Sequence, residues 1–243
     1  MNVVILQPSY IPWRGYFHQI AKADLFVFYD DVQYDKHGWR NRNRVKTVNG
    51  TQWMTIPVLS GGVVENNVPI NQIKIDWKRD WNVKHFQTLS QSYAKSPCYK
   101  QYEPFLTDYY QRHDEFLADF TIELTIALAR TLGITHTRFM RSSEIGGITG
   151  VKTERLIQIL TAVGTTHYIS GPSAKDYIDI KQFEEAGISL EYMVYDYPEY
   201  PQLFPPYDPQ VSILDLLFMV GSKAPDYIFP EPRNATASNE SHQ

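Results

Sequence analysis

The first 30 residues alternate between apolar runs and a helical pattern, and this alternation restricts the fold more than any other feature. "VVILQPSY" (3–10) begins with an apolar, β-branched run that a proline ends, which predicts a buried strand near residues 2–7. "GYFHQIAKA" (15–23) has helical spacing, and "DLFVFYDDV" (24–32) contains a second apolar run near residues 25–29. A strand, a helix and a strand over so short a distance predict a βαβ unit with parallel strands.

The same alternation returns in the second half of the chain. Strands are predicted at "THTRFMRSS" (135–143), "HYIS" (167–170) and "SLEYMVYDY" (189–197), and helices at "TERLIQILTAVG" (153–164), "IKQFEEAG" (180–187) and "SILDLLFMVG" (212–221). Ser212 is the expected N-cap of the last helix. We therefore predict an α/β protein with a Rossmann-like parallel sheet flanked by helices.

Two segments interrupt the alternation. "RNRVKTVNGTQWMTIPV" (42–58) contains Asn49-Gly50 between two β-like runs, which predicts a β-hairpin with this pair as its two-residue turn. A helical pattern over about residues 78–133 predicts a helical insertion. We expect residues 1–230 to form a single α/β domain, and the polar residues 231–243 to form a disordered tail.

Composition limits the function classes. The net charge of −4 argues against nucleic acid as a partner, because nucleic-acid binding favours a positive excess. Cys98 is the single cysteine, which excludes an internal disulfide and a multi-cysteine zinc site, and the scattered histidines predict no metal site. No secretory signal opens the sequence and no apolar run is long enough to span a membrane, so we expect a cytoplasmic protein.

The hairpin concentrates positive charge on one face. Within "WRNRNRVK" (39–46), the cations occupy every second position. A turn that pairs Val48 with Thr51 therefore places them on the same face of the hairpin. This face carries Arg42, Arg44, Lys46, Trp53 and Thr55, with Arg40 next in line. Adjacent like charges repel, so the row becomes favourable when an anion such as phosphate lies over it. The alternative is a solvated edge strand, where cations discourage aggregation.

Asn41 and Asn43 fall on the opposite, core-facing side of the same strand. A buried amide needs hydrogen-bond partners, which a polar site offers more readily than an apolar core. The two asparagines are therefore predicted to support the site from behind.

Three loops and one helix supply further candidates. "QPSYIPWRGYF" (7–17) leads into a helix N-terminus, where backbone N–H groups can bind an anion; the alternative is a tight turn with Trp13 as a core plug. Asp30 follows the second strand and is a candidate base, or else a solvated turn carboxylate. "YISGPSAKDY" (168–177) ends a strand in small residues before Lys175, which suits a phosphate or a plain turn. His85 on the helical insertion is a second candidate base, or a structural histidine.

Several segments together resemble the WbqC-like protein family, in order, from about residue 3 to 221. They are "QPSYIPWRGYF" (7–17), "DLFVFYDDVQY" (24–34), "WRNRNRVK" (39–46), "WMTIPV" (53–58), "TERLIQIL" (153–160), "YISGPSAKDYI" (168–178) and "VSILDLLFMVG" (211–221). The family pattern falls on Gln7, Pro8, Tyr10, Pro12, Trp13, Gly15, Tyr16, Asp30, Gln33, Trp39, Asn41, Arg42, Asn43, Ser170, Gly171 and Pro172.

The resemblance implies a transferase of bacterial surface polysaccharide biosynthesis, notably of the lipopolysaccharide O-antigen. It implies that an acyl or aminoacyl group, such as glycyl, is added to an amino sugar that is free or nucleotide-linked. In that role the hairpin cations would hold a diphosphate, Trp53 or Trp39 would stack on the ligand, and Asp30 or His85 would take the amine proton.

Two other functions stay open. The loop after the first strand also looks similar to that of nucleotidylyltransferases, which suggests an ATP-using enzyme that forms an acyl adenylate. Trp13 and Tyr16 stand where those enzymes carry two histidines, which speaks against this alternative. A non-catalytic binding protein of the same pathway is the second alternative. The sequence requires no cofactor, and ATP or an activated acyl donor are the candidates.

The predicted site lies where the loops at 7–16 and 30–34, the hairpin face at 39–55 and the turn at 170–177 converge. Its binding candidates are Gln7, Tyr10, Trp13, Arg14, Gly15, Tyr16, Gln33, Trp39, Arg40, Arg42, Arg44, Lys46, Trp53, Ser170, Gly171 and Lys175.

Overall fold

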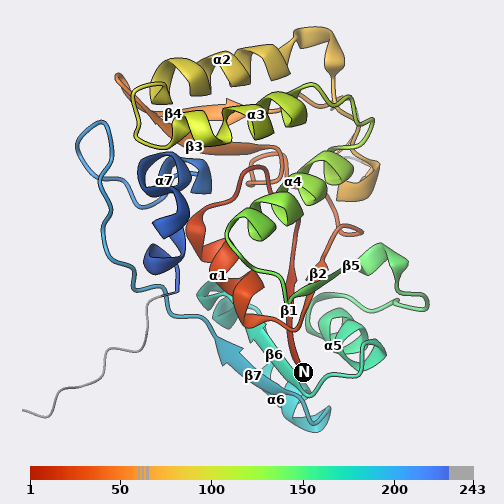
Figure 1. Ribbon diagram of the computed structural model, residues 1–243. Coiled ribbons are helices and arrows are strands. Elements are labelled where there is room, and N and C mark those ends of the chain that lie inside the picture. The colour runs from red at the N-terminus through yellow and green to blue at the C-terminus, as the bar shows by residue number, and fades with distance from the viewer. Residues whose placement is uncertain (60, 62, 64–65, 230–243) are drawn as a thin grey trace, which may run out of the picture.

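Five parallel strands form the centre of the protein (Figure 1). The computed structural model describes residues 1–59, 61, 63 and 66–229. The strands are β1 (Asn2–Leu6), β2 (Leu25–Phe28), β5 (Arg138–Arg141), β6 (His167–Ser170) and β7 (Ser189–Tyr192). They lie in the order β5-β2-β1-β6-β7, and every neighbouring pair is parallel. The prediction of an α/β, Rossmann-like sheet is confirmed.

Helices cover both faces of this sheet. α1 (Arg14–Lys22) and α4 (Leu117–Thr131) pack on one face, and α5 (Lys152–Ala162) and α6 (Ile180–Glu185) pack on the other. Side chains of a strand alternate between these layers, so Val4 belongs to the first core and Val3 to the second. The carboxyl ends of the strands, where sites form in such sheets, are left for the loops.

A long insertion separates β2 from α4. It contains the hairpin strands β3 (Arg42–Thr47) and β4 (Gly50–Thr55), the short turns η1 (Ile70–Gln72) and η2 (Trp77–Arg79), and the helices α2 (Trp81–Tyr93) and α3 (Tyr99–Tyr110). The hairpin, α2 and α3 gather at one end of the molecule (Figure 1). The predicted helical insertion is therefore confirmed as helical, but its last helix, α4, leads directly into β5 and connects two strands of the sheet.

The hairpin register differs from the predicted one by two residues. Thr47 pairs with Gly50, so the turn residues are Val48 and Asn49. Gly50 has φ +95°, and the asparagine is absent from the positive-φ residues. The glycine therefore takes the left-handed position after the turn, and the predicted turn with two positive φ angles is wrong. A shift of two residues keeps each side chain on its face, so the cations of β3 still alternate with the buried residues.

The remaining elements complete the carboxyl edge and the C-terminal part. They are η3 (Ser142–Glu144), η4 (Pro172–Asp176), α7 (Ile213–Val220) and η5 (Gly221–Tyr227). Ser212 caps α7 as predicted, accepting a hydrogen bond from the Leu214 N–H. β7 ends at Tyr192 instead of continuing to residue 197. The predicted tail at 231–243 lies outside the described residues.

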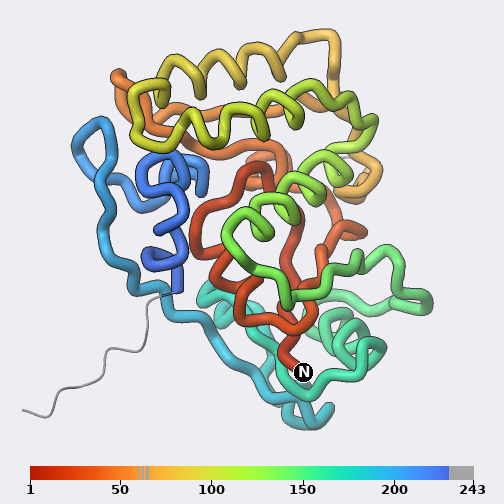
Figure 2. The backbone as a smooth tube through the Cα atoms, in the orientation of Figure 1, coloured from red at the N-terminus to blue at the C-terminus, as the bar shows by residue number. Residues whose placement is uncertain are grey.

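Residues 193–211 form a strap that runs along one side of the molecule from β7 toward the hairpin (Figure 2). Arg14 holds this strap from the start of α1. Its guanidinium donates to the carbonyls of Pro198 (2.8 Å) and Tyr227 (3.2 Å) and to the Tyr207 hydroxyl (2.8 Å). It also lies 4.6 Å from the ring centre of Tyr197. Side-chain contacts of Arg14, and not pairing with a further strand, thus hold this part of the strap against the molecule.

Replacement of Arg14 by methionine should lower the free energy of unfolding by about 3 kcal/mol, since several charge-assisted hydrogen bonds from a buried guanidinium are lost. Urea denaturation of the two proteins measures this change. Arg130→Met, at the exposed end of α4, is the matched control and should change the stability by less than about 0.5 kcal/mol. Equal losses in both variants would show that Arg14 does not anchor the strap.

Candidate functional site

A cavity of about 550 Å³ opens between the end of the hairpin, the loop after β2 and the start of α2. Its volume suits a small-molecule ligand. Lys36, Arg79 and Lys84 are among its lining residues, together with His37 and His85, and none of its lining residues in the described part of the chain is a carboxylate. The cavity is therefore a favourable environment for an anion.

His85 forms part of the wall of this cavity and is 8% exposed. Its Nδ1 lies 2.9 Å from the Tyr10 hydroxyl, which in turn lies 2.5 Å from the Tyr110 hydroxyl. Burial lowers the pKa of His85 to about 4, and the backbone carbonyl of Thr55 offsets part of this effect. At neutral pH the imidazole is uncharged, and burial raises the pKa of Tyr10, so this phenol is uncharged too.

The positions of the protons along the hydrogen-bonded chain His85–Tyr10–Tyr110 decide whether His85 can accept or donate a proton. The Tyr10 hydroxyl has one hydrogen, which goes either to His85 Nδ1 or to Tyr110. If Tyr10 donates to Tyr110, Nδ1 is the protonated nitrogen and Nε2 carries the lone pair that can accept a proton. If Tyr10 donates to Nδ1, the proton is on Nε2 and the imidazole is a hydrogen-bond donor.

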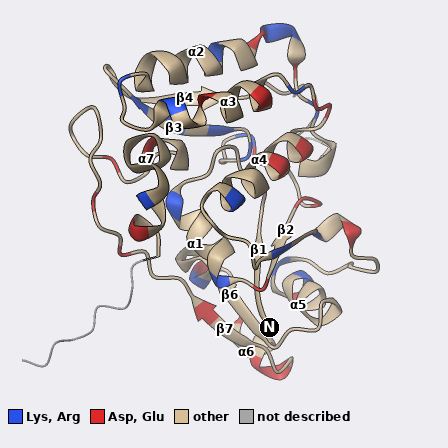
Figure 3. Ribbon diagram, viewed as in Figure 1, with Lys and Arg blue, Asp and Glu red and all other residues tan. Residues whose placement is uncertain are grey.

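The outer face of the hairpin carries two exposed tryptophans. Trp39 is 40% and Trp53 is 48% exposed, with ring centres 5.0 Å apart. The Arg42 guanidinium lies 4.5 Å from the Trp53 ring centre and donates to the backbone carbonyls of Gly38 and His37. Figure 3 marks the lysine and arginine positions along β3 in blue. Such a surface, with flat rings beside a guanidinium, suits a sugar or base that carries an anionic group.

This indole face continues into the cavity. Thr55 pairs with Arg42 across the hairpin and also lines the cavity. Arg42 binds the carbonyl of His37, which lines it too. We therefore treat the cavity and the indole face as one candidate site, called the hairpin site.

The strap covers the other end of the cationic row. Lys46 is 1% exposed and donates to the carbonyl of Pro206, so the prediction that it lies on an open face is wrong. Arg44 remains partly exposed, but it donates to the Gln210 carbonyl at 2.7 Å and lies 3.7 Å from Asp208. Of the two arginines in this row, Arg42 is the one without a carboxylate partner among the described residues.

Asp30 has a structural environment. It is fully buried, and its carboxylate accepts hydrogen bonds from the Ser143 N–H (3.1 Å) and hydroxyl (2.9 Å). Burial raises its pKa, which these hydrogen bonds and Arg141 partly offset. Of the two predicted bases, His85 lines the cavity, whereas Asp30 holds η3 at the end of β5.

The loop at 7–16 is organised by packing. A Cβ at Gly15 would lie 2.3 Å from the Trp13 ring, so a glycine is required beneath the indole and not for the approach of a ligand. Tyr16 is buried and donates to the Gln7 carbonyl at 3.0 Å. With Arg14 buried under the strap, neither its charge nor the Tyr16 hydroxyl is free for an anion.

Three polar residues attach the hairpin segment to its surroundings. Asn43 is buried and donates to the carbonyls of Tyr10 and Ile11, both at 3.0 Å. Asn41 is buried and donates to the Ile56 carbonyl at 2.8 Å. Arg40 reaches the Pro8 carbonyl at 3.5 Å, and its Nε is buried without a partner among the described residues. Gln33 is exposed and forms an isolated bridge with Pro69.

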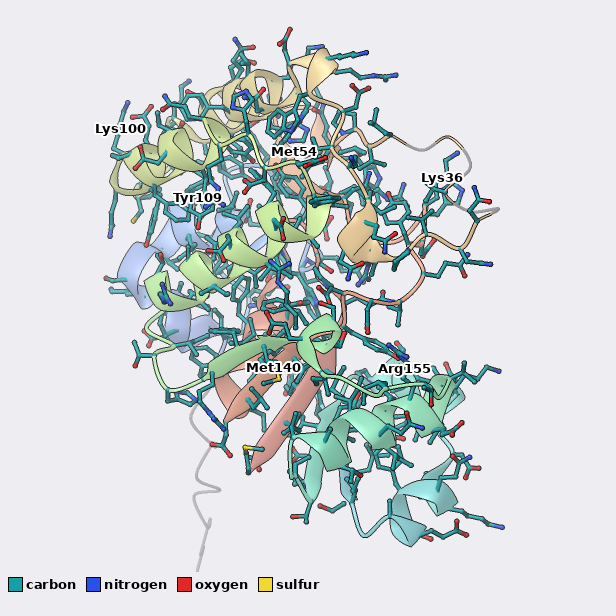
Figure 4. All side chains as sticks on the ribbon, turned by 90° about the vertical axis from the view of Figure 1, so that its right-hand side faces the viewer. Lys36, Met54, Lys100, Tyr109, Met140 and Arg155 are labelled. Atoms are coloured by element: carbon teal, nitrogen blue, oxygen red, sulfur yellow. The ribbon has the colours of Figure 1, made fainter. Side chains whose placement is uncertain are left out.

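The turn at 170–177 does not join the hairpin site. Ser170 is buried and donates to the Tyr168 hydroxyl at 3.2 Å, and the Gly171 carbonyl accepts from Ala174 within the turn. Among the described residues, its other hydrogen bonds go to α5, β7 and the turn itself. Figure 4 shows Arg155 of α5 in the lower part of the molecule, whereas Lys36 and Met54 lie in the upper part. The structure thus divides the predicted convergence into two clusters.

Sequence reasoning missed part of the cavity wall. Trp81, Lys84 and Arg79 line it from the start of α2, and Tyr110 of α3 completes the hydrogen-bonded row behind His85. A signal was present, because Trp81 and His85 are four residues apart and so share one face of the helix.

The comparisons with known proteins agree with this arrangement of segments. The model of the WbqC-like protein family matches residues 7–227, which include the hairpin site. The chain belongs to the WbqC-like family. A relative from Mycobacterium tuberculosis, "Uncharacterized protein Rv1507c", is 42% identical over 230 residues, which are 93% of this chain and 97% of the relative. No solved structure matches the chain significantly.

Two features are absent from the described part of this WbqC-like protein. None of its described helices has both the length and the apolar character needed to cross a membrane. Within the same residues, no group of three or more His, Cys, Asp or Glu side chains is placed to hold a metal ion.

The burial of His85 should make the WbqC-like protein less stable in mild acid. In the unfolded chain this imidazole takes up a proton near pH 6.5, whereas in the folded protein it does so only near pH 4. The unfolded state thus binds more protons between these values, and the free energy of unfolding should fall by up to about 3 kcal/mol as the pH is lowered through them.

Urea denaturation at a series of pH values, with His85→Gln as the comparison, measures this effect. The two curves should diverge below about pH 6.5, because other titrating groups, such as Asp30 and Asp215, are common to both proteins. Parallel curves would contradict a buried, neutral His85.

Proposed function

We propose that this WbqC-like protein is a cytoplasmic transferase of bacterial surface polysaccharide biosynthesis. It adds an acyl or aminoacyl group, such as glycyl, to an amino sugar that is free or nucleotide-linked. The observation that supports this most is the uncharged His85 in the wall of a cation-lined cavity, which has no carboxylate among its described lining residues and continues into an exposed indole pair.

The two parts of the hairpin site divide the recognition of the substrate. A hexose ring or a base stacks on Trp53 or Trp39, since indole faces bind flat apolar surfaces and leave the hydroxyl groups in water. The phosphate or carboxylate lies in the cavity near Lys36, Arg79 and Lys84. Family membership supports a sugar of surface polysaccharide as the ligand.

The chemistry requires a base. The amine nitrogen forms a bond to the acyl carbonyl carbon, the donor's leaving group departs with its electron pair, and the nitrogen loses one proton. His85 takes that proton on Nε2 when its Nδ1–H donates to Tyr10 and Tyr10 donates to Tyr110. This tautomer holds the ring in place through two phenols that stay protonated at neutral pH.

Substrate binding would also make His85 a stronger base. Its pKa of about 4 in the free protein results mainly from burial. An anion held by the cations of the cavity stabilises the imidazolium and raises this pKa toward neutrality. The proton is therefore accepted most readily when an anionic substrate is present.

Arg42→Ala and Trp53→Ala should each weaken the binding of a nucleotide-linked amino sugar by about tenfold, because each removes part of the stacked guanidinium–indole surface. Isothermal titration calorimetry measures the affinity. Lys100→Ala, an exposed cation on α3, is the control and should bind as the wild type does. Wild-type affinity in both hairpin variants would place the ligand elsewhere.

His85→Gln should lower kcat by about 100-fold or more, as expected for the loss of a general base, with a smaller change in KM. Purified protein is incubated with a panel of amino sugars and activated acyl or aminoacyl donors, and the products are detected by mass spectrometry. An unchanged kcat would exclude His85 as the base. If the wild-type protein converts no member of a wide panel, the transferase proposal fails and a non-catalytic binding protein is favoured.

A further inference from the structure

The carboxyl ends of β1 and β6 enclose a second place where a ligand can bind. β1 is followed by α1 on one face of the sheet, and β6 is followed by α6 on the other face. The chain therefore leaves these two adjacent strands in opposite directions, and in parallel sheets such a position is where ligands bind; we call it the crevice.

The sheet face beneath α5 and α6 changes character at this crevice. Nearer the amino ends of the strands, Val3, Ile5 and Val27 form an apolar core on this face. Ser170 lies level with Ile5 in the register and pairs with Tyr192 on β7.

Two more polar side chains extend the same face. Gln7 and Tyr29 are two residues beyond Ile5 and Val27, so they lie at the carboxyl end of that face. The carboxyl ends of the four adjacent strands β2, β1, β6 and β7 thus carry polar or phenolic side chains in place of an apolar layer. These are Tyr29, Gln7, Ser170 and Tyr192.

Phenol groups gather around this edge. Burial raises the pKa of Tyr168, and the neighbouring phenols of Tyr177, Tyr29 and Tyr192 raise it further. Tyr177 is 57% exposed, so its ring borders the solvent. Burial raises the pKa of Tyr29 to about 12, despite the opposing charge of Arg155. All of these phenols are therefore protonated and can donate hydrogen bonds at neutral pH.

Several groups of the cluster have unused binding capacity. The Tyr192 hydroxyl and the Arg155 Nε are buried and have no hydrogen-bond partner among the described residues. The Lys175 ammonium lies 5.1 Å from the Tyr192 ring centre, and no described carboxylate lies within 4.0 Å of it. Arg155 is paired with Asp31 at 2.6 Å, whereas Lys175 is the cation of this cluster that has no carboxylate partner among the described residues.

We infer that this crevice is a nucleotide site, separate from the hairpin site, in which the phenol rings contact the base and ribose and Lys175 binds the phosphates. The aromatic faces and the free cation match the two halves of a nucleoside di- or triphosphate. The loop after β1 has no glycine-rich phosphate fingerprint, so side chains must bind the phosphates. This inference does not rest on the proposed transferase reaction.

Calorimetry with the full-length protein tests the inference. The probes are ATP, ADP, CDP and UDP, with adenosine and pyrophosphate as the separate halves of the ligand. At least one nucleotide should bind, and its affinity should fall about tenfold in Lys175→Ala and in Tyr177→Ala, since each removes one exposed half of the site. Tyr192→Phe, which removes the unpartnered hydroxyl and keeps the ring, should weaken binding less.

Matched controls distinguish binding in the crevice from binding at the hairpin site and from a general loss of positive charge. Lys181→Ala removes an exposed cation from the neighbouring α6 and should keep the nucleotide affinity of the wild type. The losses in Lys175→Ala and Tyr177→Ala should be equally large in an Arg42→Ala background, because the hairpin site is separate. The inference is overturned if no nucleotide binds, if Lys175→Ala and Tyr177→Ala bind normally, or if pyrophosphate binds as tightly as the nucleotides. Weaker nucleotide binding in Arg42→Ala, together with wild-type affinity in Lys175→Ala and Tyr177→Ala, would place the nucleotide at the hairpin site and overturn the inference.

Discussion

Tyr10 connects the sheet to the insertion, and the hairpin site depends on it. Its N–H donates to the Trp39 carbonyl, its own carbonyl accepts from Asn43, and its hydroxyl meets His85 and Tyr110. Tyr10, in the loop after β1, thus binds the hairpin segment, α2 and α3 at the same time. Tyr10, Asn43, His85 and Tyr110 are buried, so loss of a hydrogen bond among them would leave a buried polar atom without a partner.

The distribution of charge on the hairpin follows from what covers it. Lys46 lies beneath the strap, where its charge offsets part of the cost of burying Asp215, whose pKa burial raises. Tyr93 joins the two residues, because its hydroxyl donates to Asp215 and accepts from the Lys46 N–H. Arg42, outside the strap, keeps its charge at the surface on Trp53. A single row in the sequence is therefore divided into a buried structural part and an exposed binding part.

Local patterns predicted most of the fold. The apolar runs identified the parallel strands, and the alternation along residues 41–46 placed the buried asparagines and the partly exposed Arg42 on opposite faces. The hairpin register was missed because Asn49-Gly50 fits more than one turn, and the φ of the glycine decides between them.

The functional clusters were harder to predict because they depend on contacts distant in sequence. Lys46 is buried by a proline 160 residues away. The hydroxyl that reaches His85 comes from Tyr10, 75 residues earlier. Asp30 is satisfied by Ser143, 113 residues later. None of these pairs leaves a periodic signal in the sequence, so residue type and spacing could identify the candidates but not their roles.

The two carboxylates after β2 connect the crevice to the rest of the structure. Adjacent residues of an extended chain point to opposite sides, so Asp30 binds Ser143 while Asp31 pairs with Arg155 beside the phenols. Ser142 lies between them, since its hydroxyl accepts from the Asp30 N–H at 3.2 Å and donates to Asp31 at 2.5 Å. A phosphate that drew Arg155 away would leave Asp31 with Ser142 alone and raise the cost of its charge. Lys175, which makes no such pair, can bind a phosphate without this cost, and this is why the free cation is the better ligand at the crevice.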